Sequence, residues 1–226
     1  MNINYNTYWS NIKYFNRILL RILLNNRLKI NKIISENIEY NKKSNVLDIG
    51  STPSLEQHQN VFLHLYPWKD KVTCISNLDC KVLNKLYPKI TILKGDGRKL
   101  ELKNNLFDLV HSNAVIEHVG SFENQIKFVK ECVRVSKSKI CINTPNRFFP
   151  IDSHTKIPLI HMFPKRLHRF ILRIFGLNYF SLEENLNLVS KKDLIKICKK
   201  LNLKNYKIIN YYFLGFISNF ILIIEK

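Results

Sequence analysis

Hydrophobic residues along the chain follow two different periods. From about residue 8 to residue 38 they recur at steps of three and four, the spacing of one face of an α-helix, which predicts one or two amphipathic helices. The apolar positions of this stretch are Trp9, Ile12, Phe15, Ile18, Leu19, Ile22 and Leu23. We therefore expect residues 1–43 to form a helical arm ahead of one larger domain over residues 44–226.

Beyond the arm, short apolar and β-branched runs alternate with stretches of helical period. Alternation of this kind is typical of parallel strands joined by helical crossovers, and it predicts a doubly wound, Rossmann-like α/β sheet. Strands are predicted at residues 45–49, 71–75, 91–94, 106–112 and 138–143, and helices near 55–65, 80–86 and 122–135.

The pattern changes after Asn143. A Pro- and aromatic-rich segment leads into a basic helix at about 165–175, and another helix is predicted at about 191–201. The last apolar stretch, IINYYFLGFISNFILII, is interrupted by Asn, Gly and Ser, and it favours an antiparallel hairpin over a membrane span. With this hairpin the sheet has seven mostly parallel strands in an α/β/α sandwich, and residues 145–190 form an insertion in it.

Composition adds a strong positive charge to this picture. Lysine and arginine outnumber the acidic residues 36 to 17, which gives a formal net charge of +19. Such a charge is typical of nucleic-acid binding. The chain is also rich in Lys, Asn and Ile throughout, which favours a general basic background that assists an anionic substrate or a membrane surface. Nucleic acid stays open as a partner.

Cysteines and histidines do not indicate a metal centre. The five cysteines form no C-x-x-C pair, so we expect buried free thiols in a reducing, cytoplasmic environment. His154, His161 and His168 recur every seven residues, but Pro158 and Pro164 break any helix that would carry them on one face. We expect no metal site from these three.

The first predicted strand ends in Asp48-Ile49-Gly50, where ligands bind in doubly wound sheets. Gly50 permits a tight turn and a close approach of a ligand to the backbone. Neither G-x-G-x-x-G nor G-x-x-x-x-G-K-[ST] occurs, which argues against a dinucleotide cofactor and against nucleoside triphosphate hydrolysis. The alternative for Asp48 is a carboxylate that caps the turn.

Three segments together resemble the class I S-adenosylmethionine-dependent methyltransferases. They are VLDIGSTPS, GDGRKLELKNNLFDLVHSNAVIEHVGS and KICINTP, and they span most of residues 44–145. The continuation TPNRFFPIDSHTKIPLIHMFP resembles a bacterial subgroup of the type 11 methyltransferases whose substrate is unknown. The resemblance implies S-adenosylmethionine as the cofactor and transfer of its methyl group to an acceptor.

The resemblance also assigns roles around the cofactor. Asp48 is expected to orient the methionine amino group, and Asp96 to accept from the adenine amino group. The family usually has an acid at the tip of the second strand for the ribose, where this chain has Ser76 and Asn77. We expect Asp79 to reach back in their place, with the two neutral side chains as the alternative. The other implied cofactor contacts are Gly50 and Ser51 at the methionine end, Gly97 beside the adenine, and Asn113 and Ala114 at the sulfonium.

Catalytic candidates follow the fourth predicted strand. Glu117 and His118 are placed where acceptor and methyl group would meet, and His118 titrates in the range useful for a base. The alternative is that His118 packs against the cofactor or caps a helix. His154, on the insertion, is expected in the acceptor pocket.

We therefore expect a methyltransferase that acts on a small molecule, a lipid-linked intermediate or a glycan. The insertion is expected to form the acceptor side, and the basic helix near 165–175 to lie on a membrane surface, with core packing of its apolar face as the alternative. An RNA methyltransferase and a non-catalytic binding or assembly protein on a decayed methyltransferase scaffold stay open. The expected location is cytoplasmic, peripheral to the inner membrane, and the oligomeric state is left undetermined.

Overall fold

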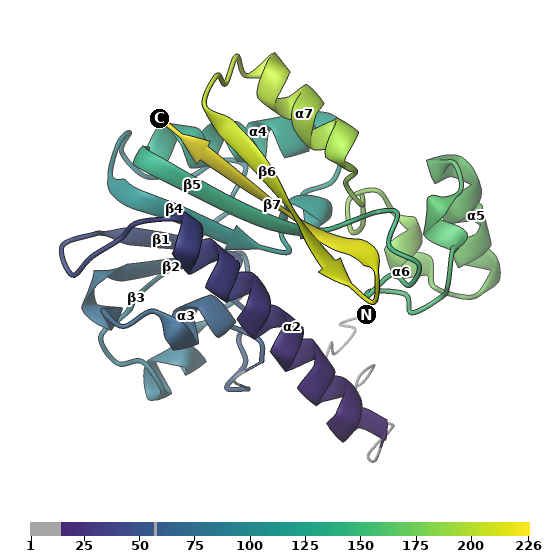
Figure 1. Ribbon diagram of the computed structural model, residues 1–226, viewed down its shortest axis with the longest axis horizontal. Coiled ribbons are helices and arrows are strands. Elements are labelled where there is room, and N and C mark those ends of the chain that lie inside the picture. The colour runs from purple at the N-terminus through teal and green to yellow at the C-terminus, as the bar shows by residue number, and fades with distance from the viewer. Residues whose placement is uncertain (1–14, 57) are drawn as a thin grey trace.

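The computed structural model describes residues 15–56 and 58–226 (Figure 1). Within them, helix α2 runs over Phe15–Asn37, which matches the helical period of the arm. The apolar positions Trp9 and Ile12 of that pattern lie outside the described residues. Ile30, Ile34 and Ile38 are buried against the sheet, so α2 shares the core of the larger domain. A separate arm over 1–43 stays a prediction.

The described residues build the predicted seven-stranded sheet. Its strand order is β3-β2-β1-β4-β5-β7-β6, and β7 runs antiparallel to both of its neighbours while the other pairs are parallel. The doubly wound fold with a C-terminal hairpin is confirmed. The strands are β1 Val46–Ile49, β2 Val72–Ser76, β3 Thr91–Lys94, β4 Phe107–Asn113, β5 Ser136–Pro145, β6 Tyr206–Phe213 and β7 Phe216–Glu225.

The helices follow the predicted positions, with two differences. The expected helix near 55–65 is reduced to α3, Val61–Leu65, because the Asn60 side chain bonds the backbone of Thr52 and Ser54 and holds the preceding residues as a loop. The stretch near 80–86 is a 3₁₀ turn, η2 Lys81–Lys85. Other short turns are η1 Lys69–Lys71, η3 Ile116–His118 and η4 Ile160–Met162, and the remaining helices are α4 Phe122–Val135, α5 Lys165–Ile174, α6 Asn178–Ser181 and α7 Lys191–Lys200.

Two hydrophobic cores lie on the two faces of the sheet. Side chains alternate along each strand, so Leu47 packs under α4 and α7 while Val46 packs under α2 and α3. Central strand β1 is buried over its whole length. The result is the predicted α/β/α sandwich, which leaves the carboxyl ends of β1 and β4 at one edge of the sheet.

A polar network fixes α4 to the loop over residues 100–104. The Glu131 carboxylate accepts from the Leu100 amide at 2.8 Å and is paired with Arg134, which also donates to the carbonyls of Leu100 and Leu102. Hydrogen bonds from Arg134 outweigh the effect of burial and, with the Leu100 amide, hold the pKa of Glu131 below its ordinary value.

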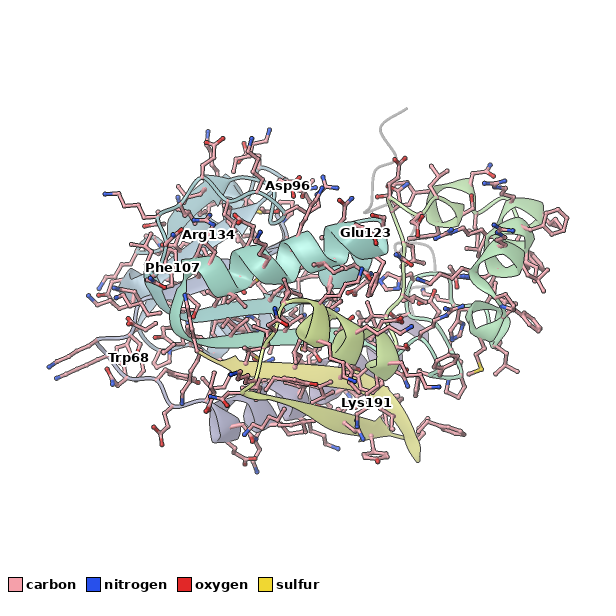
Figure 2. All side chains as sticks on the ribbon, turned by 90° about the horizontal axis from the view of Figure 1, so that it is seen from above. Trp68, Asp96, Phe107, Glu123, Arg134 and Lys191 are labelled. Carbon is pink, nitrogen blue, oxygen red and sulfur yellow. The ribbon has the colours of Figure 1, made fainter. Side chains whose placement is uncertain are left out.

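The insertion projects beyond one end of the sheet. α5 and α6 contact each other there and stand apart from the strands in both views (Figures 1 and 2). In the described part of the chain, no helix combines the length and the hydrophobicity that crossing a membrane requires. All five cysteines are free and buried, as predicted.

Candidate functional site

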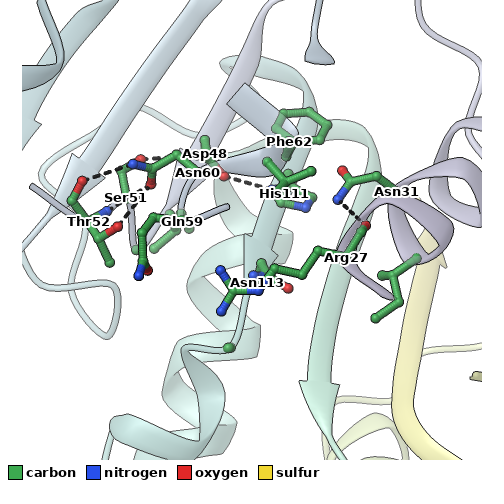
Figure 3. Close-up of a pocket in the computed structure, with 15 residues that line it drawn as sticks. Arg27, Asn31, Asp48, Ser51, Thr52, Gln59, Asn60, Phe62, His111 and Asn113 are labelled. Atoms are coloured by element: carbon green, nitrogen blue, oxygen red, sulfur yellow. Dashed lines mark hydrogen bonds and ion pairs between the residues drawn. The ribbon is translucent and has the colours of Figure 1, made fainter. Parts of the chain in front are cut away.

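A pocket opens at the carboxyl ends of β1 and β4, between α2 and the residues that follow β1 (Figure 3). This is the edge of the sheet where doubly wound folds bind ligands. Five of the predicted cofactor residues line it, namely Asp48, Gly50, Ser51, Asn113 and Ala114.

Asp48 is the centre of a buried polar group in this pocket. Its Cα is paired with that of His111 across β1 and β4, and His111 Nδ1 lies 2.7 Å from Asp48 Oδ1. Ser51 Oγ donates to the other carboxylate oxygen at 3.0 Å. The His111 ring stacks on Phe62, with centroids 3.9 Å apart. Asp48 is therefore held rigidly, and each of its oxygens keeps a further lone pair for a ligand.

Gly50 turns the chain sharply at the end of β1. Its φ of +93° favours glycine, and an added Cβ would lie 2.1 Å from Val115 Cγ2. Ala114, on the other side of the pocket, also has a left-handed backbone with φ of +54°. Its amide donates to the carbonyl of Asn143, and the Asn143 side chain donates to Asn113 Oδ1 at 2.5 Å. These hydrogen bonds join the carboxyl ends of β4 and β5 and fix this side of the pocket.

Arg27 supplies a positive charge to the same pocket. It reaches from α2 toward Asn113 (Figure 3) and donates to the carbonyl of His58. Burial lowers the pKa of its guanidinium, but the ordinary value is high enough that the group stays charged. A cation and an anion, Arg27 and Asp48, therefore line one pocket.

The predicted adenine and ribose residues lie outside this pocket. Asp96 follows β3 and is exposed, and Arg98 binds both of its oxygens with the closest approach 2.6 Å. Hydrogen bonds from Arg98 outweigh burial and lower the pKa of Asp96. Gly97 packs so closely on the Phe128 ring that an added Cβ would lie 2.8 Å from it. Asp79 is exposed and accepts from the Lys81 amide.

The three catalytic candidates come together at the end of η3. His118 Nε2 lies 3.0 Å from His154 Nε2, and Glu117 Oε1 lies 4.0 Å from the same His154 nitrogen. Glu117 is fully buried, and its Oε2 accepts from Thr144 Oγ1 of β5. His154 Nδ1 lies 2.8 Å from Asp152 Oδ1. The insertion therefore places His154 and its carboxylate partner, Asp152, beside η3.

Burial and Asp152 act on His154 in opposite directions. Burial alone lowers the pKa of this imidazole, but the hydrogen bond and charge of Asp152, together with the charge of Glu117, outweigh it and raise the pKa. Burial raises the pKa of Asp152, and hydrogen bonds from His154 and Thr155 reverse this and hold it well below its ordinary value. For His118, desolvation dominates and lowers the pKa.

Several pocket residues were not predicted from the sequence. Arg27 stood among many basic residues of a helical stretch, with nothing to set it apart. His111 had a signal, because a histidine directly follows the apolar pair Leu109 and Val110 in the buried part of β4. Asp108, from the same run, lies at the opposite end of β4 and accepts from the Asn45 amide. The other unpredicted lining residues are Ile30, Asn31, Ile49, Thr52, Gln59, Asn60, Val61 and Phe62.

A family model described as a methyltransferase domain matches residues 60–139. A search of curated proteins finds no match.

Solved structures share the fold at low sequence identity. A S-adenosylmethionine-dependent methyltransferase from Thermotoga maritima, described as a possible histamine N-methyltransferase, is 15% identical with a TM-score of 0.56, over 95% of each chain. A S-adenosylmethionine-dependent methyltransferase from Aquifex aeolicus is 14% identical with a TM-score of 0.57, over 86% of this chain and 88% of the other. A phosphoethanolamine N-methyltransferase from Haemonchus contortus, in complex with phosphomonomethylethanolamine and S-adenosylhomocysteine, is 18% identical with a TM-score of 0.55, over 82% of this chain and 39% of the other. The expected resemblance to class I methyltransferases is confirmed for the fold.

Proposed function

We propose that this chain, which has the class I methyltransferase fold and a methyltransferase-domain match over residues 60–139, transfers a methyl group from S-adenosylmethionine to a small, lipid-linked or glycan acceptor. Bound S-adenosylmethionine supplies an activated methyl group on a sulfonium. The observation that carries the proposal is the pair of opposite charges, Asp48 and Arg27, in one pocket at the ligand-binding edge of the sheet.

This charge pair matches an amino acid zwitterion. Asp48 Oδ1 and Oδ2 are each fixed by one donor, so their remaining lone pairs are available to an ammonium group. The planar fork of Arg27 suits a carboxylate. We propose that Asp48 holds the methionine amino group and Arg27 its carboxylate, with Gly50 and Ser51 at the same end. Asn113 and Ala114 would then face the sulfonium.

The adenosine end of the proposed site lies toward the ends of β2 and β3. Asp96 can accept from an adenine amino group only with the lone pairs that Arg98 leaves free, and the Gly97 amide is next to it. We keep Asp79 as the proposed ribose partner. Its bond to the Lys81 amide uses Oδ1 and leaves Oδ2 for a hydroxyl.

The acceptor is proposed to bind between η3 and the insertion. Ala114 at the pocket is only a few residues from Glu117 and His118, and His154 extends the same cluster from the other side. Methyl transfer from a sulfonium depends chiefly on holding the two reactants in line. With η3 on one side and the insertion on the other, the acceptor would be held in this way. Residues 145–190 are thus the proposed acceptor side.

The test is calorimetric titration of the purified chain with S-adenosylmethionine and S-adenosylhomocysteine, followed by methyl transfer from labelled donor to acceptor pools. We expect one binding site per chain and label in an extractable lipid, glycan or small molecule. Label that appears only with added RNA would move the function to the RNA alternative. An absence of binding to either ligand by the folded chain would leave the non-catalytic alternative standing.

The outer face of α5 supports a lipid-linked acceptor. Leu167, Phe170 and Ile174 recur at helical spacing on this face and are 43%, 59% and 67% exposed. His168 and Leu172 are buried on the opposite face, so the helix is anchored by one side and presents the other. The expected alternative, that this apolar face packs in the core, is therefore not what the structure has.

Exposed arginines lie beside this apolar face. Arg166 and Arg173 are seven residues apart on one flank of α5, and both are exposed. An apolar strip next to positive charges is typical of helices that lie on anionic membranes. We propose that α5 rests on an anionic lipid surface and brings the acceptor side of the site to it.

Sedimentation with vesicles tests this surface. We expect binding to vesicles that contain phosphatidylglycerol, and Leu167→Ser with Phe170→Ser and Ile174→Ser should weaken it at least about 10-fold, because each side chain transfers apolar area worth on the order of 1 kcal/mol. The matched control is Leu86→Ser. Leu86 is also an exposed leucine (47%), and it directly follows η2, far from the insertion. Equal loss in the control, or no vesicle binding by the intact chain, would refute the proposal.

A further inference from the structure

Three donor atoms converge where η3 meets the insertion. Glu117 Oε1, His118 Nε2 and His154 Nε2 all lie within 4.8 Å of one another. Across residues 15–56 and 58–226, no other group of three or more His, Cys, Asp or Glu side chains comes this close. The arrangement depends on the fold, since His154 is 36 residues beyond His118.

The hydrogen bonds that His118 and His154 make through Nδ1 determine which ring nitrogen carries the proton and which has a free lone pair. His118 Nδ1 lies 2.7 Å from the carbonyl oxygen of Asn185, which can only accept, so the proton of this ring is on Nδ1. His154 Nδ1 faces the carboxylate of Asp152 at 2.8 Å and carries its proton there for the same reason. In the neutral form of each ring, Nε2 is therefore the nitrogen with the free lone pair, and the two Nε2 atoms lie only 3.0 Å apart.

Glu117 adds a third lone pair to the same place. The side chain is fully buried, and its Oε1 has no hydrogen-bond partner among the described residues. A buried carboxylate oxygen without a partner is costly. A proton shared between the two imidazoles would relieve their repulsion but would leave Glu117 Oε1 without a bond. One cation among all three atoms satisfies each of them.

We propose that Glu117, His118 and His154 bind a divalent first-row transition metal ion. Two imidazoles and one carboxylate are the ligands of such ions, whereas Mg²⁺ and Ca²⁺ prefer oxygen ligands alone. Metal–nitrogen bonds of about 2.1 Å place two ligand nitrogens about 3.0 Å apart at a right angle, which is the separation of His118 and His154. Glu117 needs a shift of roughly 1 Å to complete the set, within the reach of its side chain.

The residues behind the ligands support this assignment. Asp152 behind His154 and the Asn185 carbonyl behind His118 form the two arrangements that usually orient metal-binding imidazoles. Asp152 is itself fixed by the amide and the hydroxyl of Thr155. Three protein ligands leave coordination positions open for a further ligand.

The role of the ion, unlike its binding, rests on the proposed methyltransferase function. Coordination lowers the pKa of a hydroxyl, as it does that of water. An acceptor hydroxyl bound there would release its proton to solvent. Its oxygen would then form the new bond to the methyl carbon as the carbon–sulfur bond of the donor breaks. This role indicates a hydroxyl-bearing acceptor and O-methylation.

Metal binding can be measured without any acceptor. The chain is prepared without a histidine tag, stripped with a chelator, and titrated with Zn²⁺ by calorimetry and with Co²⁺ by visible absorption. We expect one ion per chain, a d–d band that reports nitrogen and oxygen ligands, and a rise in melting temperature on saturation. Asp152→Asn should weaken binding about 10- to 100-fold, and Glu117→Gln and His154→Gln should weaken it further.

The matched control is His64→Gln, an exposed histidine on α3 that should leave binding unchanged. The proposal is overturned if the folded, stripped chain takes up neither ion, or if Glu117→Gln and His154→Gln bind as tightly as the intact chain. Metal binding without S-adenosylmethionine binding would keep the site and remove the proposed function. Methyl transfer by the stripped chain at an undiminished rate would keep the function and remove the ion's role in it.

Discussion

The charge of Asp48 should control affinity for the amino acid part of the cofactor and for nothing else. In Asp48→Asn, the amide oxygen can still accept from His111 Nδ1, and the amide nitrogen can donate to Ser51 Oγ. Both internal hydrogen bonds survive, so the fold of the pocket is retained. What is lost is the negative charge at the proposed position of the ligand's ammonium group.

The size of this loss follows from hydrogen-bond energetics. A hydrogen bond to a charged group contributes about 1.5–3 kcal/mol and a neutral one about 0.5–1.5 kcal/mol. The difference of about 1–2 kcal/mol corresponds to a roughly 5- to 30-fold higher Kd for S-adenosylhomocysteine. Methylthioadenosine, which lacks the amino acid end, should bind the variant and the intact chain equally.

Calorimetry with the two ligands checks this prediction. The matched control is Asp108→Asn, which removes a carboxylate from the opposite end of β4, where it binds the Asn45 amide and Lys137. That variant should bind both ligands normally. If Asp48→Asn weakens methylthioadenosine as much as S-adenosylhomocysteine, or changes neither, the assignment of Asp48 to the amino group is wrong.

Three further variants test the site and the core. Arg27→Met should raise the Kd for S-adenosylhomocysteine about 10-fold and leave methylthioadenosine binding nearly unchanged, by calorimetry, because a carboxylate partner is lost. Gly97→Ala should lower stability by about 1–3 kcal/mol in denaturant unfolding, since the new methyl group meets the Phe128 ring. Glu131→Gln should destabilise by about 1 kcal/mol at pH 7. Because the pKa of Glu131 is lowered in the fold, this difference should shrink as the pH falls below its ordinary value of 4.5; a constant difference would refute the role given to Arg134.

The order of strands and helices could be read from the sequence. Alternating strand-like and helical periods predicted the doubly wound sheet, and the interrupted apolar stretch at the end predicted the hairpin of β6 and β7. Local period carries this information because each element buries its own apolar face. The expected helix near 55–65 was too long, because the contacts of Asn60 with the preceding loop are not a property of local period.

Positions in the site were predictable only where a motif marked them. Asp48 lies near the end of β1, Gly50 directly follows this strand, and both line the pocket. Arg27 resembles every other basic residue of its helix, and only the packing of α2 against the sheet brings it there. The pairing of Asp96 with Arg98 depends on the conformation of the two side chains, which the sequence motif around Asp96 does not reveal.

Periodicity and strand-end residues are local properties of the chain, so they were enough to predict the fold class and the edge of the sheet at which the pocket opens. Tertiary packing sets which charges meet there. It places Arg27 in the pocket with Asp48, and it brings His154 of the insertion to 3.0 Å from His118 and 4.0 Å from Glu117, distances that the expected acceptor pocket did not specify. Distances between residues far apart in the chain are set by the packing of whole elements, and the chemistry proposed for this protein depends on those distances.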